Sequence, residues 1–335
     1  MTRRCLCAMT LLAGAAFAQN RTFYFPHTDS PKTLQEQCNA IRSVADTNAT
    51  ADPEKMAITV TGTAEQLSIA AWVSNELDKA PAGRQTLVRH DYPGTVGQNQ
   101  LVRVYFPAYL ETPQELQEAV NLSRATADIQ RFLPVFGSGA IVARAELDPL
   151  DLGGWILGEI DQPAGQIKPG GRDRAVKNVD ARTGNMSQVY VLANIDTPQA
   201  MQELVNGVRS LADIQRCFPF NARRVIALRG STDQIAFADW LFQLLDQPAA
   251  GMAIDAATHE YRYIPGSPRD TASVARVFFL NHVESAQRLQ EIINEVRTAS
   301  QIQRMYPNNQ TRSIALRGTG DQVARAEQMI KERDQ

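Results

Sequence analysis

Histidine and acidic side chains are the first candidates for chemistry in this chain, because together they can supply an acid, a base or metal ligands. The histidines are scattered, at His27, His90, His259 and His282. His259 is followed directly by Glu260, but neighbouring residues of a strand point to opposite faces of a sheet. The sequence lacks the Gly-x-Ser-x-Gly, His-Glu-x-x-His, phosphate-loop and paired-cysteine motifs. We therefore expect no enzyme: no catalytic residues, no metal site and no cofactor.

Three tryptophans, Trp72, Trp155 and Trp240, lie at the same distance before an aspartate. In the helix expected around Trp240, apolar residues at helical spacing form one side, and the tryptophan lies away from it. Such a tryptophan either covers the linker or module that follows, or it is exposed and binds a ligand. The last copy of this position is Gln328, which favours the covering role.

Arginines recur at two strand positions. Arg131, Arg216 and Arg304 share the first, and Arg144, Arg229 and Arg317 share the second. They could form a basic stripe that holds an acidic partner or a phosphate of a polysaccharide. The alternative is a solvated strand face whose arginines pair with nearby acids. Together with the tryptophans, these arginines are the candidate contacts between modules or with a partner.

These positions belong to an internal repeat. The fragment Asp128–Arg131 returns unchanged as Asp213–Arg216, and with one difference as Gln301–Arg304. A long period of this kind defines the architecture. It predicts four tandem α+β modules, each a strand-helix-strand-strand-helix unit with two helices packed on a small sheet. Their ranges are 19–80, 100–162, 186–247 and 273–335, joined by linkers 81–99, 163–185 and 248–272, and the second copy is the most divergent.

Helix starts mark each module. The first helix begins at Ser30-Pro31, Thr112-Pro113 and Thr197-Pro198, where a capping side chain precedes a proline. The second helix begins with Ser/Thr-x-x-Gln directly after Gly62, Gly230 and Gly318. The second module departs, since Ala145 replaces the glycine, and there Asp148-Pro149 is expected to start the helix. The linker stretches 86–92 and 259–264 are extended in character and could each add an edge strand.

The N-terminal segment predicts export. Met1–Ala18 combines Arg3 and Arg4, an apolar run and an Ala-x-Ala cleavage site, which is the pattern of a secretory signal peptide. No later segment is apolar enough to span a bilayer. After cleavage only Cys38 and Cys217 remain, in different repeats, and we expect two buried thiols rather than a bridge between them.

The charge balance argues against nucleic acid as a partner. The chain has 34 Lys and Arg against 36 Asp and Glu, and loss of the signal peptide makes it more acidic. Phosphate binding depends on clustered positive charge. With 44% hydrophobic and 21% charged residues the composition is that of an ordinary globular protein.

The repeated modules resemble a known family. The segment from Arg317-Gly318-Thr319 to Gln322-Val323-Ala324, and the corresponding segment Arg229–Asp246, are similar to the periplasmic N-terminal modules of bacterial secretins. The resemblance implies a KH-like module fold and contacts with other proteins of a secretion or pilus machine. The sequence contains no long series of alternating strands of the kind that forms an outer-membrane gate. The resemblance therefore does not extend to channel activity.

From these observations we expect a periplasmic or secreted protein. Its function would be interaction with an envelope protein, or self-association, in the assembly of a bacterial envelope system. The alternative is a soluble binding protein for envelope glycan or peptide that uses the tryptophan positions.

Overall fold

The computed structural model describes residues 18–79, 86–97, 99–163, 165–177, 184–248, 259–265 and 270–335. The predicted signal peptide, apart from Ala18, and parts of all three predicted linkers lie outside these ranges. The chain divides into two compact units, one of residues 1–81 with 135–140, the other of residues 82–134 with 141–335. Within the described residues, no helix is long and apolar enough to cross a membrane.

The first unit contains a three-stranded antiparallel sheet in the order β1-β3-β2. Two helices complete this module. Its elements in chain order are β1 (Gln19–Tyr24), α1 (Pro31–Ala45), β2 (Asn48–Asp52), β3 (Ala57–Gly62) and α2 (Ala64–Leu77).

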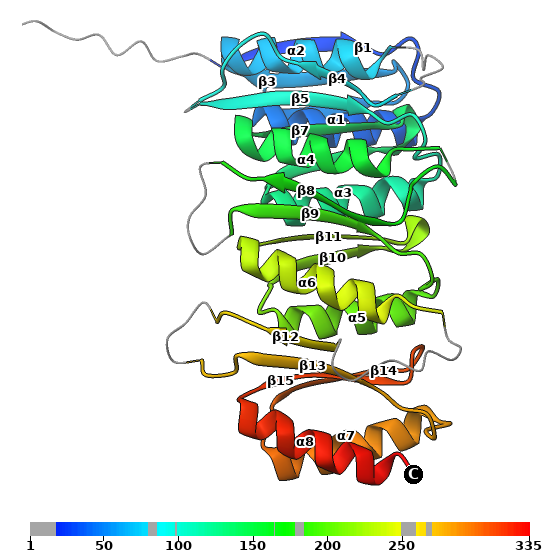
Figure 1. Cartoon of the computed structure of the whole chain (residues 1–335). Coiled ribbons are helices and arrows are strands. Elements are labelled where there is room, and N and C mark those ends of the chain that lie inside the picture. The colour runs from blue at the N-terminus through cyan, green and yellow to red at the C-terminus, as the bar shows by residue number, and fades with distance from the viewer. Residues whose placement is uncertain are drawn as a thin grey trace, which may run out of the picture. The chain divides into compact units, whose positions relative to one another are not determined.

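The other three modules repeat this order and add one strand at the start, so each sheet has four antiparallel strands. The second module has β4 (Val88–Asp91), β5 (Gln100–Phe106), α3 (Pro113–Ala127), β6 (Arg131–Val135), η1 (Phe136–Ser138), β7 (Ala140–Glu146) and α4 (Leu147–Ile160). The third has β8 (Gly170–Ala175), β9 (Met186–Val191), α5 (Pro198–Leu211), β10 (Arg216–Phe220), η2 (Asn221–Arg223), β11 (Val225–Gly230) and α6 (Thr232–Leu245). The fourth has β12 (Glu260–Arg262), β13 (Val274–Phe279), α7 (Ala286–Ser300), β14 (Arg304–Asn308), β15 (Ser313–Gly318) and α8 (Gly320–Arg333). The predicted α+β fold of tandem modules is confirmed (Figure 1).

The helix starts follow the capping signals of the sequence. Ser30, Thr112 and Thr197 accept a backbone hydrogen bond at the start of the first helix. Reciprocal capping boxes open α2, α6 and α8. The predicted start of α4 is wrong, since the helix begins at Leu147, and Glu146 precedes it without a side-chain cap. Asp148 and Pro149 lie within the first turn, where proline needs no hydrogen-bond donor.

Linker residues supply the added strands. β4 and β12 fall within the two stretches predicted as edge strands, and each pairs with the strand that follows it. The third, β8, pairs with β9. Each added strand therefore occupies the edge beside the first strand of its module, and in the first module β1 has no such neighbour among the described residues.

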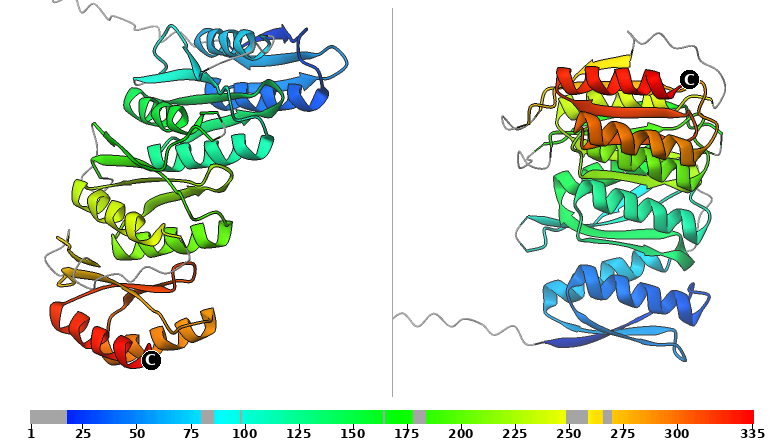
Figure 2. Two further views of the ribbon diagram at one scale, coloured as in Figure 1. Left: turned by 45° about the vertical axis from the view of Figure 1, so that its right-hand side comes forward. Right: turned by 90° about the horizontal axis from the view of Figure 1, so that it is seen from below.

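In the second unit the helices of one module also cover the sheet of the next. Figure 2 shows α5 and α6 between the sheet β8–β11 and the sheet β12–β15. Leu204 and Phe237 of these helices share one apolar cluster with Ala275, Val277 and Ala315 of the fourth sheet. The opposite face of that sheet packs on α7 and α8. Burial of apolar surface thus continues from one module into the next, as in other stacked repeats.

Both terminal modules present polar surfaces where inner modules are apolar. On the outer side of α7 and α8, Glu295, Arg325 and Gln328 are exposed. The same positions of the second and third modules carry apolar or small residues. Glu295 corresponds to Leu122 and Gly207, Arg325 to Leu152 and Phe237, and Gln328 to Trp155 and Trp240. In the first module the sheet face away from its helices displays Thr22, Thr50 and Thr59 side by side, all exposed. In the fourth module those three positions are Val277, Tyr306 and Ala315.

The two cysteines outside the predicted signal peptide are buried free thiols, as expected from the sequence. Burial raises the pKa of Cys217 to about 12, and burial also raises the pKa of Cys38. Both thiols therefore stay protonated and serve as small apolar groups of the core.

Candidate inter-module interface

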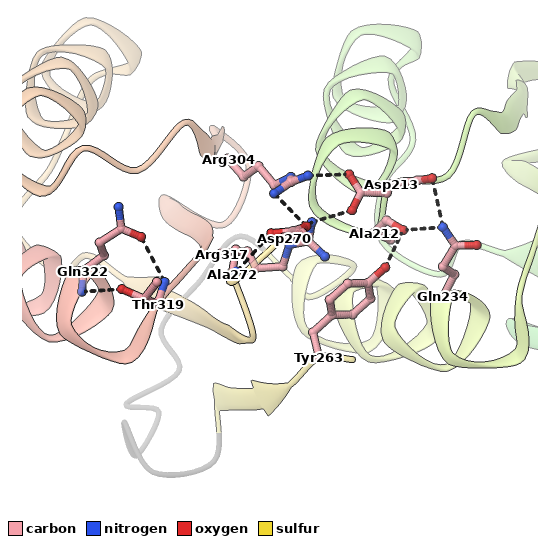
Figure 3. Close-up of polar contacts among 10 residues, drawn as sticks. All are labelled: Ala212, Asp213, Gln234, Tyr263, Asp270, Ala272, Arg304, Arg317, Thr319 and Gln322. Carbon is pink, nitrogen blue, oxygen red and sulfur yellow. Dashed lines mark hydrogen bonds and ion pairs between the residues drawn. The ribbon is translucent and has the colours of Figure 1, made fainter. Parts of the chain in front are cut away.

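Two of the predicted arginines contact the loop that follows the first helix of the preceding module. Arg304 and Arg317 are register partners on β14 and β15, so their side chains share one sheet face. Arg304 lies 3.0 Å and Arg317 2.5 Å from the two carboxylate oxygens of Asp213. Asp270, just before β13, contacts the same arginines at 3.1 and 3.2 Å (Figure 3). Two guanidinium groups and two carboxylates therefore form one compact cluster.

The chain geometry after α5 positions Asp213. Its φ of 54° lies in the left-handed region, which aspartate tolerates better than most residues. Gln234, the third residue of α6, donates through Nε2 to the carbonyl of Asp213 at 2.9 Å and to that of Ala212 at 3.0 Å. The same glutamine accepts from the backbone N–H of Ser231, which completes a capping box. A helix cap therefore also fixes the loop that carries the carboxylate.

Burial makes this cluster energetically important. The Arg317 side chain is 0% exposed, whereas that of Asp213 is 37% exposed. The guanidinium lies over the ring of Tyr263, 4.1 Å from its centroid, and the Tyr263 hydroxyl donates to the Ala212 carbonyl at 3.2 Å. Burial raises the pKa of Tyr263, so this phenol stays neutral. A buried cation is stable only when it is paired, and the carboxylates supply that compensation.

A related contact joins the second and third modules. Arg216 lies 2.8 Å from Asp128, which again follows the first helix of the preceding module with a left-handed φ of 62°. Arg223 of η2 also reaches α3, with its Nε 2.8 Å from Glu115. Arg229, the counterpart of Arg317, is buried and donates to the Gly184 carbonyl at 3.3 Å. Burial, together with the nearby charge of Arg216, lowers the pKa of Arg229.

The remaining predicted arginines are Arg144 and Arg131. Arg144 donates to the side chain of Gln100 at 2.8 Å, and Arg131 is half-buried at the start of β6. Arg216, Arg304 and Arg317 thus contact carboxylates of the preceding module. Whether any of them also binds a separate partner stays a prediction.

The tryptophans are half-buried and lie on three different helices, α2, α4 and α6. The Trp240 ring packs on Phe237 at 5.6 Å and on Tyr261 of β12 at 5.3 Å between centroids. The Trp155 ring lies 5.9 Å from the guanidinium of Arg174 on β8. In the second unit each tryptophan thus contacts the strand that the following segment supplies, which is the geometry of the covering role.

Comparisons with known proteins give little beyond this geometry. No family model matches the chain, and no curated protein matches it. Among solved structures it is similar to ExeD of Aeromonas hydrophila, with 12% identity over 71% of this chain and 42% of that one, at a TM-score of 0.16. It is also similar to a chain of the pilotin–secretin AspS–GspD complex of ETEC, with 10% identity over 69% and 38%, at a TM-score of 0.17. The chain spans less than half the length of either, and scores this low leave its function to be argued from its own residues.

The residues first considered for acid and base chemistry are engaged in packing and pairing. Glu260 forms an ion pair with Arg276 of β13, its register partner. His259 is buried and its ring lies edge-on to Phe279, with 5.4 Å between centroids. The described part of the chain holds no group of three or more metal-ligating side chains. These contacts assign the pair to the anchoring of β12.

Sequence reasoning missed the acidic half of the interface, although the repeat contained the signal. The recurring fragment carries an aspartate and an arginine three residues apart. The aspartate of one copy pairs with the arginine of the next, Asp128 with Arg216 and Asp213 with Arg304. In the last copy the aspartate position is Gln301, which is uncharged. Asp270 and Tyr263 lie in the third predicted linker and have no such repeat signal.

Truncation of Trp240 tests the covering role. We expect Trp240→Ala to lower the free energy of unfolding by about 2 kcal/mol, roughly half the loss for a fully buried aromatic ring, since the ring is half-buried. Denaturant melts of the mature chain measure the change. The matched control is Gln328→Ala, at the same repeat position, with an expected change within about 0.5 kcal/mol. An unchanged melt for Trp240→Ala together with lost binding to an envelope glycan would favour the ligand role instead.

Proposed function

We propose that this protein is an exported, non-enzymatic assembly factor that binds another protein of the bacterial envelope, in connection with a secretion or pilus system. The observation that carries the proposal is the contact between the third and fourth modules. There Arg304 and Arg317 form ion pairs with Asp213, and one apolar cluster includes residues of both modules. A row of modules held in this way presents several surfaces at fixed spacing. Weak contacts along such a row add to useful affinity without a deep pocket.

Two further observations support this proposal. The sequence resembles the periplasmic modules of secretins, which make protein contacts. Two described features of the second unit also count against the glycan alternative, which depends on exposed aromatic faces. Trp240 packs on Tyr261, and a hollow of about 750 Å³ beside α5 has Asn194, Gln199 and Asn309 in its wall with no aromatic residue.

Self-association by continued stacking is the less favourable form of assembly. A further copy placed on α7 and α8 would meet Glu295, Arg325 and Gln328, where the inner modules offer apolar contacts. Glu295 is already paired with Arg333 at 2.6 Å. Covering these exposed polar groups costs free energy unless new partners replace water. A different protein is therefore the favoured partner.

Affinity purification tests the proposal. Tagged mature chain, residues 19–335, is incubated with envelope extract, and bound material is identified by mass spectrometry. We expect a protein partner in near-stoichiometric amount. Asp213→Asn, which loosens the junction of the third and fourth modules, should reduce recovery, while Asp128→Asn at the same repeat position should reduce it less. Recovery of only glycan or small molecules would contradict the assembly role and leave the binding-protein alternative in front.

A further inference from the structure

The added strands of the second unit are anchored by one repeated polar contact. In the second module, Arg103 of β5 binds Asp91 of β4, its register partner, through hydrogen bonds of 2.5 and 2.9 Å. In the fourth module, Arg276 of β13 pairs in the same way with Glu260 of β12. The added strand therefore brings a carboxylate to a fixed position on the first strand of its module.

The third module keeps the arrangement with an amide in place of the cation. Gln188 of β9 donates to Asp173 of β8, its register partner, at 2.9 Å. In all three modules the helix side supplies a second carboxylate to the same strand residue, from Asp151, Asp239 and Glu327. Because the contact recurs in three sheets, we take the carboxylate of the added strand as the group that specifies its pairing with the first strand of the module.

The first module has the cation, but among the described residues it has no added strand. Arg21 of β1 occupies the position of Arg103 and Arg276, opposite Val60 of β3. Its guanidinium lies 5.2 Å from the Phe23 ring, just as Arg276 lies over Phe278. Arg21 is exposed, and no acidic side chain of the described residues pairs with it. Among the described residues, no strand pairs with β1 at the edge that β4, β8 and β12 fill in the other sheets.

The backbone of β1 is ready to accept a strand at this edge. The Phe25 N–H donates to Met56 on the β3 side at 2.9 Å. Alternate residues of an antiparallel strand direct their N–H and C=O groups to opposite neighbours. Asn20 and Thr22 therefore direct these groups away from β3, toward the open edge. Unpaired edge groups of this kind are the template for strand addition.

The charge at this edge selects among possible occupants. Residues 1–18 contain no aspartate or glutamate, so this chain's own N-terminal segment cannot supply the missing carboxylate. β1 itself, residues 19–24, also has no acid, so pairing with β1 of a second copy would leave Arg21 without an anion. An extended segment of another polypeptide that carries an acid would reproduce the contact seen in the other sheets.

We propose that the β1 edge is a docking site for an extended segment of a partner protein, which adds antiparallel to β1 and places an Asp or Glu opposite Arg21. The proposal deepens the assembly role, on which it rests for the existence of a protein partner. Main-chain hydrogen bonds would supply affinity and the carboxylate would supply register. The chain's own segments 88–91, 170–175 and 260–262 define the chemistry of such a strand.

A peptide titration tests the site directly. The probe is a fluorescently labelled synthetic peptide of residues 86–93, whose acid is Asp91, added to the mature chain and followed by anisotropy. We expect saturable binding of one peptide per chain, since in the other three sheets the corresponding edge is already occupied by β4, β8 or β12. Arg21→Glu in the protein, or Asn in place of Asp91 in the peptide, should each weaken binding at least tenfold. Amide hydrogen exchange should slow at Asn20 and Thr22 when peptide is added.

Thr22→Pro provides the sharpest control. It removes an N–H that faces the open edge and leaves the bonds to β3, a position at which edge strands tolerate proline. It should abolish peptide binding with an unchanged melt, and Arg21→Glu carries the test if the proline variant fails to fold. No saturable binding at millimolar peptide, or full binding by the Arg21→Glu variant, would overturn the proposal and make Arg21 a charge that protects the edge. Recovery of a protein partner from extract despite such a result would leave the assembly role standing.

Discussion

Asp213→Asn should lower the free energy of unfolding by about 3 kcal/mol, because it leaves a fully buried arginine with reduced compensation. The Arg317 side chain is 0% exposed, and its Nη2 makes both contacts to carboxylates, 2.5 Å to Asp213 and 3.2 Å to Asp270. Its Nε and Nη1 have no hydrogen-bond partner among the described residues. Asp270 still offers one anion, so the loss should fall at the lower end of the range for broken buried pairs, roughly 3–5 kcal/mol.

The repeat supplies a matched control for this change. Asp128→Asn alters the same position of the preceding copy and keeps the same left-handed backbone, which asparagine also tolerates. Its partner Arg216 is 24% exposed and Asp128 is 53% exposed, so solvent screens the pair. We expect a loss of about 0–1 kcal/mol. Denaturant melts of the mature chain and both variants decide the matter, and equal losses would contradict the role assigned to burial of Arg317.

The second large effect is expected for Phe237→Ala, at about 4 kcal/mol, within the range for deletion of a buried aromatic ring. Phe237 is fully buried and projects from α6 toward the fourth module. Its ring meets those of Tyr261 and Tyr263 with 5.0 Å between centroids in each case. Truncation opens a cavity at the junction of two modules, so the third and fourth modules should also unfold less cooperatively.

Arg325→Ala is the control, since Arg325 occupies the position of Phe237 on α8 and is exposed. Substitutions at such surface positions usually change stability within about 0.5 kcal/mol. Calorimetry of the mature chain gives both the loss and the number of transitions. A loss below about 1 kcal/mol for Phe237→Ala would mean that the shared cluster contributes little to holding the modules together.

Much of the fold could be predicted because its signals are local. Capping residues beside glycines or prolines set the helix starts, and the repeat allowed weak signals in one copy to be read from another. The start of α4 was misplaced because the second copy lacks the glycine and the cap. β8 was missed because it opens with Gly170 and Gly171, and glycine disfavours strands.

The interface was harder to predict than the fold. The arginines could be found from their recurrence, but a choice between partners and intramolecular acids depends on contacts between distant residues. Arg304 and Asp213 are 91 residues apart in sequence. Phe237 illustrates the same limit, since it lies off the apolar stripe of α6 and is buried only because another module covers it.

The polar surfaces of the terminal modules make the number of inner copies adjustable. The third module carries one half of each junction. Its Arg216 pairs with Asp128 of the second module, and its Asp213 pairs with Arg304 of the fourth. A duplicated segment 163–247 would bring both halves of each junction, together with its own added strand. Repeat number can therefore change by whole copies while the two ends stay the same. In evolution or by design, each duplication of this segment would lengthen the row of modules in the second unit by one copy.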